Sequence, residues 1–154
     1  MAVFKFKLLP YQRLLQHQKE AAELELSLKL ARVREVRGML MMLEKEQEAL
    51  NDNLGQRLKT GMNSEEYRMW VNRIESLEQE ASKLEEMLRE REIEAEKAKK
   101  RLLDIHIKER LVERLRERSF KAFQMEEAKR YQAELDDLAN SIKSIWSSTG
   151  ESHY

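Results

Sequence analysis

Apolar residues recur along this chain in alternating steps of three and four residues. One such series has nine apolar residues in twelve positions: Leu15, Lys19, Ala22, Leu26, Lys29, Val33, Val36, Leu40, Leu43, Gln47, Leu50 and Leu54. A second has twelve in sixteen: Trp70, Ile74, Leu77, Ala81, Leu84, Leu88, Arg91, Ala95, Ala98, Leu102, Ile105, Glu109, Val112, Arg116, Ser119 and Phe123. A period of 3.5 residues is typical of a coiled-coil seam, so both stretches are predicted to be long helices.

Between the two series lies the single predicted reversal of the chain, residues 58–66. Gly61 can end the first helix in a left-handed conformation, and Asn63 or Ser64 can cap the second. Because this connection is short, the helices must be antiparallel neighbours. We therefore predict an all-α fold, a long antiparallel two-helix coiled-coil hairpin.

The predicted domain organisation is one hairpin over residues 1–146. Its parts are a helix at 10–58 starting at the only proline, a turn at 59–64 and a helix at 65–146. A small, polar tail at 147–154, predicted to be disordered, follows the hairpin. Residue 10 should face about residue 112, which leaves the second helix overhanging. The overhang carries an apolar stripe that the first helix cannot reach: Ala128, Tyr131, Leu135, Leu138, Ile142 and Ile145. A monomer and a pair of hairpins forming a four-helix bundle both remain open.

Composition narrows the possible functions. With 38% charged residues, four glycines and one proline, the chain lacks the turns of sheet folds. Its formal net charge of zero gives no overall attraction to nucleic acid or to an anionic membrane. It has no cysteine, no signal-peptide pattern and no apolar run near the roughly 20 residues that span a bilayer. We expect a cytoplasmic protein without direct membrane insertion.

Catalytic chemistry finds no support in the residue pattern. His17, His106 and His153 lack the spacing of metal ligands, and the glycines form no phosphate-binding loop. Carboxylates on a thin helical hairpin are solvated and do little acid or base catalysis. We predict that the chain is not an enzyme and needs no cofactor or metal.

Local charge is more informative than the total. Residues 108–121 contain six basic and three acidic side chains, close to Phe120 and Phe123. Arginines beside exposed aromatic rings are typical of protein-binding hot spots, whereas interleaved glutamates argue against nucleic acid. The alternative is a solvated helix with ion pairs four residues apart. Near the turn, the apolar residues Tyr67, Met69, Trp70 and Val71 form either a cap or a second contact patch.

Four segments in order resemble the FliJ family of the bacterial flagellar export apparatus. They are Phe4-Lys5-Phe6-Lys7-Leu8, Leu58-Lys59-Thr60-Gly61-Met62-Asn63-Ser64 with Ile74-Glu75-Ser76-Leu77-Glu78, Phe120-Lys121-Ala122-Phe123-Gln124-Met125-Glu126-Glu127, and Glu134-Leu135-Asp136-Asp137-Leu138-Ala139. The resemblance implies a non-enzymatic stalk, similar to the central stalk of rotary ATP synthases. It also implies three partners: the hexameric export ATPase, the cytoplasmic domain of the export gate, and export chaperones. The protein would then lie at the cytoplasmic face of the membrane.

The resemblance also assigns candidate site residues. For the ATPase they are Arg110, Arg114, Arg118, Phe120 and Phe123. For the export gate they are Trp70, Val71, Ile74 and Leu77. Ile74 and Leu77 also belong to the seam, so a packing role competes there. A generic coiled-coil scaffold and the equivalent stalk of a type III injectisome are the alternative functions.

Overall fold

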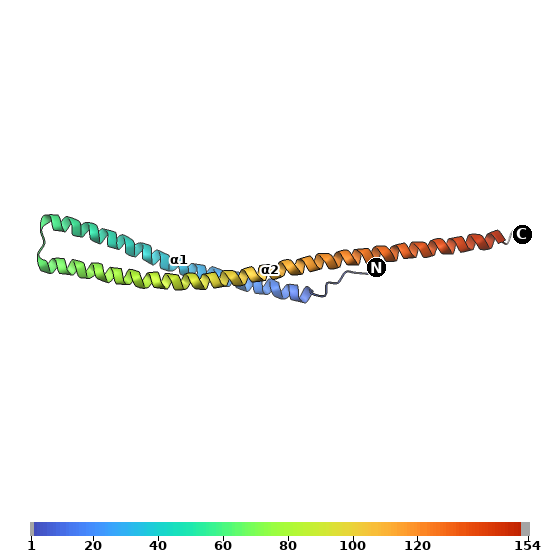
Figure 1. Ribbon diagram of the computed structural model, residues 1–154, viewed down its shortest axis with the longest axis horizontal. Coiled ribbons are helices and arrows are strands. Elements are labelled where there is room, and N and C mark those ends of the chain that lie inside the picture. Colours follow the sequence, from blue (N-terminus) through green and yellow to red (C-terminus); the bar gives the residue numbers. More distant parts are fainter. Residues whose placement is uncertain (1, 152–154) are drawn as a thin grey trace. The chain divides into compact units, whose positions relative to one another are not determined.

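The structure, a computed structural model, describes residues 2–151 and contains two helices (Figure 1). Helix α1 spans Leu9–Thr60, 52 residues, and helix α2 spans Ser64–Glu151, 88 residues. The helices pack against each other as a hairpin, and the described part of the chain contains no strand. The all-α coiled-coil hairpin predicted from the sequence is confirmed.

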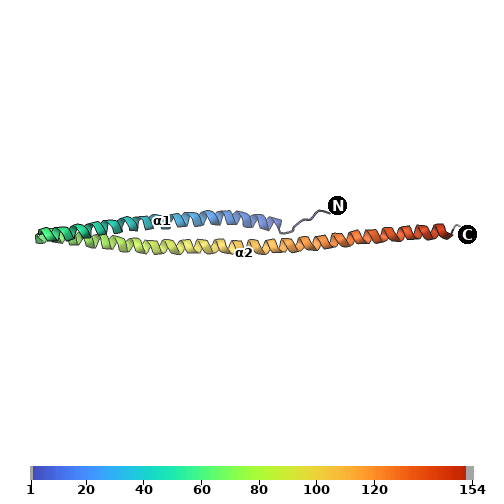
Figure 2. The same cartoon turned by 90° about the horizontal axis from the view of Figure 1, so that it is seen from above.

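The chain divides into two compact units. Residues Gln16–His106 form the first, which we call the hairpin unit because it contains the turn between the helices. The second consists of Met1–Leu15 and Ile107–Tyr154, and we call it the terminal unit. Within the hairpin unit, α1 and α2 run back along each other from the turn; they cross in the view of Figure 1 and overlap at the turn in the view of Figure 2.

Ion pairs across the hairpin unit fix its antiparallel register. The chain separation between paired residues falls steadily toward the turn: 76 for Glu25 and Arg101, 65 for Lys29 and Glu94, 55 for Arg37 and Glu92, 27 for Glu46 and Arg73, and 9 for Arg57 and Glu66. Such a decrease occurs only when the two helices run in opposite directions. These pairs are partly exposed, so each contributes little stability, but together they favour one register.

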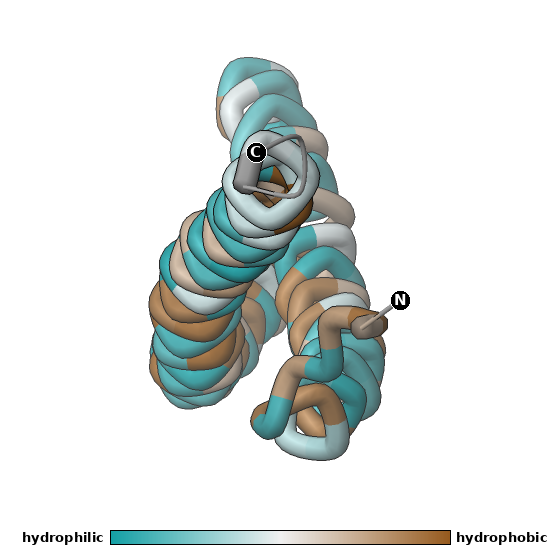
Figure 3. The backbone as a smooth tube through the Cα atoms, turned by 90° about the vertical axis from the view of Figure 1, so that its right-hand side faces the viewer, coloured by the Kyte–Doolittle hydropathy of each residue, from teal (hydrophilic) through white to brown (hydrophobic). Residues whose placement is uncertain are grey.

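The core of each unit lies on the predicted seam. Every buried apolar residue belongs to one of the two series: Leu15, Ala22, Val33, Val36, Leu43, Leu77, Ala95, Ala98 and Val112. Apolar and polar stretches alternate along both helices when the backbone is coloured by hydropathy (Figure 3). The 3.5-residue period therefore identified the buried faces correctly.

Two polar seam positions, Lys29 and Arg91, form ion pairs with the same carboxylate, that of Glu94. Lys29 Nζ lies 3.3 Å from Glu94 Oε2, and Arg91 Nη1 lies 3.6 Å from the same oxygen. The hydrogen bond from Lys29 and its positive charge lower the pKa of Glu94. Polar residues within a seam restrict the register because a shifted alignment would separate them from their partners.

The turn has the predicted caps. Gly61 has a φ of +97°, the left-handed conformation that an L side chain rarely adopts. The Asn63 side-chain oxygen accepts a 2.8 Å hydrogen bond from the Glu66 backbone N–H, so Asn63 caps α2. The non-helical connection is residues 61–63, shorter than the predicted 59–64.

In the terminal unit, the start of α1 packs on α2. Leu15 and Val112 are buried, and Gln12 Nε2 donates a 3.1 Å hydrogen bond to Glu113 Oε2. The predicted alignment of residue 10 with about residue 112 agrees with this contact. From residue 128 to residue 150, every side chain is exposed. Residues 128–150 of α2 thus form the predicted overhang, and no other described segment packs against them.

The end of α2 differs from the predicted tail. The helix continues through Glu151, whereas the sequence predicts disorder from residue 147. Ser147 Oγ and Thr149 Oγ1 donate hydrogen bonds of 3.0 and 2.9 Å to the carbonyls of Lys143 and Ile145, four residues earlier. Small hydroxyl side chains can therefore stay within a helix by bonding back to it. Residues 152–154 of the predicted tail lie outside the described residues.

Candidate functional site

The first candidate surface is a row of arginines on α2 in the terminal unit. Arg110, Arg114 and Arg118 are all exposed, and within residues 2–151 none of them forms an ion pair. Because they are spaced four residues apart, they form one slanting row on the helix surface. Their guanidinium groups are thus available to carboxylates of a partner.

The second candidate surface is a cluster of three aromatic rings. The Phe4 ring lies 5.3 Å from the Phe120 ring in an edge-to-face arrangement and 5.6 Å from the Phe123 ring. Phe4 comes from the non-helical segment before α1, so this segment partly covers α2 beyond the first helix. Phe120 stays 43% exposed, whereas Phe123 is half-buried. Phe4 therefore covers part of the surface of the Phe120 and Phe123 rings.

The arginine row and the aromatic cluster lie on different faces of α2. Residues two apart on a helix point about 200° away from each other, and Arg118 and Phe120 have this spacing. Phe123 follows Val112 by about three turns, so both lie on the seam face. Arg110 and Arg114 are each two residues from Val112, so they lie on the opposite face. The structure does not bring the five predicted ATPase residues into one patch. A partner must engage them as two surfaces.

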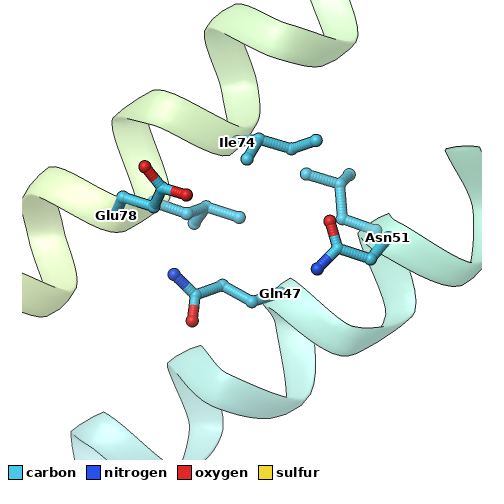
Figure 4. Close-up of a pocket in the computed structure, with 6 residues that line it drawn as sticks. Gln47, Asn51, Ile74 and Glu78 are labelled. Carbon is cyan, nitrogen blue, oxygen red and sulfur yellow. The ribbon is translucent and has the colours of Figure 1, made fainter.

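The seam residues near the turn are packed inside the hairpin unit. Leu77 is completely buried, and Ile74 is half-buried. Both line a cavity of about 230 Å³ between α1 and α2, together with Leu50, Gln47, Asn51 and Glu78 (Figure 4). Gln47 occupies a polar seam position on α1 and lines this cavity together with Ile74 and Leu77. Leu77 cannot contact a partner while the hairpin is closed.

The residues next to the turn remain accessible. Trp70 and Val71 are half-buried, while Tyr67 and Met69 are exposed, Met69 by 73%. Of the four predicted gate residues, Trp70 and Val71 thus have surface to offer, together with part of Ile74. Tyr67 and Met69 therefore also keep side-chain surface open to solvent next to the turn.

The described residues offer few groups for other chemistry. Across residues 2–151, no group of three or more histidine, cysteine, aspartate or glutamate side chains could hold a metal ion. None of the helices in that range is long and apolar enough to cross a membrane.

Comparison with known proteins decides the family. The model of the family described as "Flagellar FliJ protein" matches residues 4–143, which include both candidate surfaces. The chain belongs to the FliJ family. A search of curated proteins and a search of solved structures each gave no match. FliJ proteins are a family of non-enzymatic export components, and membership gives this chain a role related to flagellar protein export, with interactions within the export apparatus.

The FliJ match also begins at the residue that the site prediction left out. The sequence assigned Phe120 and Phe123 to a binding surface but gave Phe4 no partner. The expected register contained the signal, because a hairpin that aligns residue 10 with about residue 112 must bring residue 4 near residue 118. In the structure Phe4 contacts rings at positions 120 and 123.

Proposed function

We propose that this chain is the stalk and adaptor of flagellar protein export. In this role it binds the hexameric export ATPase and couples it to the export gate and to export chaperones. It would act in the cytoplasm, held at the cytoplasmic face of the membrane through the export apparatus. Family membership supports this proposal, and the two exposed surfaces supply candidate contacts.

The observation that carries the ATPase proposal is the unpaired arginine row. Arg110, Arg114 and Arg118 lie on the exposed side of α2, away from the seam. Within the described residues, none of the three forms an ion pair. Arginine is enriched at protein interfaces because its planar guanidinium binds carboxylates in two-pronged geometry. We expect the row to bind an acidic surface of the ATPase. This contact would not require the chain itself to bind a nucleotide.

The aromatic cluster is the second part of the proposed ATPase contact. Phe120 supplies exposed ring surface, while Phe123 holds the cluster by packing against Phe4. Aromatic rings that are fixed by neighbours lose little conformational freedom when a partner binds. The ATPase would therefore contact Phe120 directly and Phe123 through it.

The proposed contact with the export gate lies beside the turn. Trp70 and Val71 have accessible surface, and Ile74 and Leu77 hold α2 against α1 beneath them. Tryptophan is enriched among the few residues that contribute most of the binding energy at protein interfaces. We expect Trp70 to make the main contact, and Leu77 to act by positioning it.

A charge-reversal experiment tests the ATPase contact. The triple variant Arg110→Glu, Arg114→Glu, Arg118→Glu should weaken binding to the cognate ATPase at least about tenfold, since each arginine of a hot spot contributes about 1 kcal/mol or more. The readout is stimulation of ATP hydrolysis against concentration of added chain. Circular dichroism confirms that the variant stays helical.

The matched control reverses three exposed lysines of the hairpin unit, Lys97, Lys99 and Lys100. It changes the net charge by the same amount but leaves the arginine row intact, so stimulation should remain. If both variants stimulate like the unaltered chain, the arginine row does not bind the ATPase. A chain that never stimulates its cognate ATPase would favour a generic scaffold. Stimulation of an injectisome ATPase alone would favour that alternative stalk.

A further inference from the structure

The overhanging part of α2 carries an apolar surface that nothing in the described chain covers. We call it the C-terminal stripe: Ala128, Tyr131, Leu135, Leu138, Ile142 and Ile145. Its five large members are 41–64% exposed, and Trp146 beside them is 73% exposed. Exposed apolar surface of this extent marks a place where another surface binds. Its alternating spacing of three and four residues is that of a coiled-coil seam, so the missing partner is a helix.

The borders of the C-terminal stripe restrict that helix further. Along one border lie Gln132, Ala139 and Trp146, none of which is charged. Along the other lie Glu127, Glu134 and Ser141. The remaining charged side chains, such as Arg130 and Asp137, belong to the opposite half of the helix. A partner therefore has to offer an apolar seam with nearly neutral borders, which is what a second copy of this stripe provides.

We propose that two copies of this chain pair antiparallel through their C-terminal stripes. In the best register, Leu135 packs against the partner's Leu138, Tyr131 against the partner's Ile142, and Ala128 against the partner's Ile145. The two-fold axis repeats each contact, so all six stripe residues lie in matched layers of an antiparallel coiled coil. Ala128, the smallest stripe residue, packs against the partner's Ile145, next to the bulky side chain of Trp146. The large indole therefore compensates for the small volume of Ala128 in that layer.

Charge selects the antiparallel direction. The segment 108–121 has three more basic than acidic side chains. A parallel pair would align these two segments side by side and the like charges would repel. An antiparallel pair places them at opposite ends. It also aligns Glu134 with the partner's Ser141, so that no two carboxylates face each other across the border.

The register also fits the contacts within the terminal unit. With Leu135 against the partner's Leu138, the end of α2 at Glu151 reaches the partner's Ala122. The stripe contacts themselves span residues 128–145 and therefore end before Phe123, which Phe4 contacts. Pairing requires neither displacement of the segment before α1 nor opening of the seam around Val112. A register with a longer overlap between the two α2 helices would compete with the Phe4 contacts and with the packing around Val112.

Spin labels test the pairing and its direction directly. The chain has no cysteine, so single substitutions Asn140→Cys and Ser147→Cys each give one labelled site, on the face of α2 opposite the C-terminal stripe. In the antiparallel register, the two labels at position 147 should lie about 10 Å further apart than the two at position 140. Equal distances would mean a parallel pair, and absence of dipolar coupling in concentrated solution would mean no pair. Either result overturns the proposal.

A matched pair of variants tests the surface itself. Leu138→Glu buries an unpaired carboxylate in the proposed interface and should raise the dissociation constant of the dimer at least tenfold in sedimentation equilibrium. Ala133→Glu adds the same charge on the opposite face and should leave it within about threefold. Equal weakening by both variants, or none by Leu138→Glu, contradicts the proposal. The ATPase is absent from these measurements, so their failure would leave the proposed function untouched.

Discussion

The hairpin unit and the overhanging part of α2 have the same spacing of apolar residues but opposite burial. Leu77 in the hairpin unit is completely buried, because α1 packs on its face. Leu138 in the C-terminal stripe is 58% exposed, because no described segment reaches it. Heptad spacing thus identifies a face that is built to receive another helix. Burial tells whether the chain itself supplies that helix.

Truncating one leucine in each region should give the largest difference. Leu77→Ala removes buried methyl groups next to an existing cavity, and should lower the free energy of unfolding by about 2–5 kcal/mol. Leu138→Ala, in dilute solution, should change it by less than about 0.5 kcal/mol. Urea unfolding followed by circular dichroism measures both. Similar losses would mean that the C-terminal stripe is covered within a single chain.

The second comparison is between an ion pair that joins the two helices and one that lies within α2. Removing the first should lower the stability more than removing the second, and both effects should be smaller than that of Leu77→Ala. The hydrogen bond from Lys29 on α1 holds the pKa of Glu94 below its ordinary value. The ionised form therefore stabilises the folded state at every pH above the ordinary carboxyl pKa. This contribution is lost as the pH falls through the lowered value.

The variant Glu94→Gln isolates that contribution. Its unfolding midpoint should lie slightly below that of the unaltered chain from neutral pH down to roughly pH 4, and the gap should close in stronger acid. Glu127→Gln is the control, because its 3.5 Å ion pair with Arg130 lies within α2. It should shift the midpoint less at neutral pH. A constant gap for Glu94→Gln from pH 7 to pH 2 would contradict the assigned pairing.

Much of the fold was accessible from the sequence because coiled coils follow simple local rules. The two apolar series located every buried residue, and Gly61 with Asn63 located the turn. The end of α2 was not accessible in the same way. Serine, threonine and glycine near residue 147 favour turns on average, but at a helix end their hydroxyls can bond back to the preceding turn.

The candidate site was predictable only in part. The resemblance named Arg110, Arg114 and Arg118 as candidate ATPase contacts, and their spacing of four residues places them in one row on the helix surface. It did not show that Phe4 packs on Phe120, because this contact joins segments 116 residues apart and depends on how the chain runs before α1. The burial of Leu77 was foreseen as a competing role, since that residue lies on the seam.

Hydrogen exchange of the backbone amides along α2 tests the central claim most directly. If the hairpin unit is paired and the overhang is not, amides between residues 74 and 105 should be the best protected in dilute solution. Those between residues 128 and 150 should exchange much faster, because a helix without a packing partner opens easily. Equal protection along the whole of α2 at low protein concentration would contradict this account.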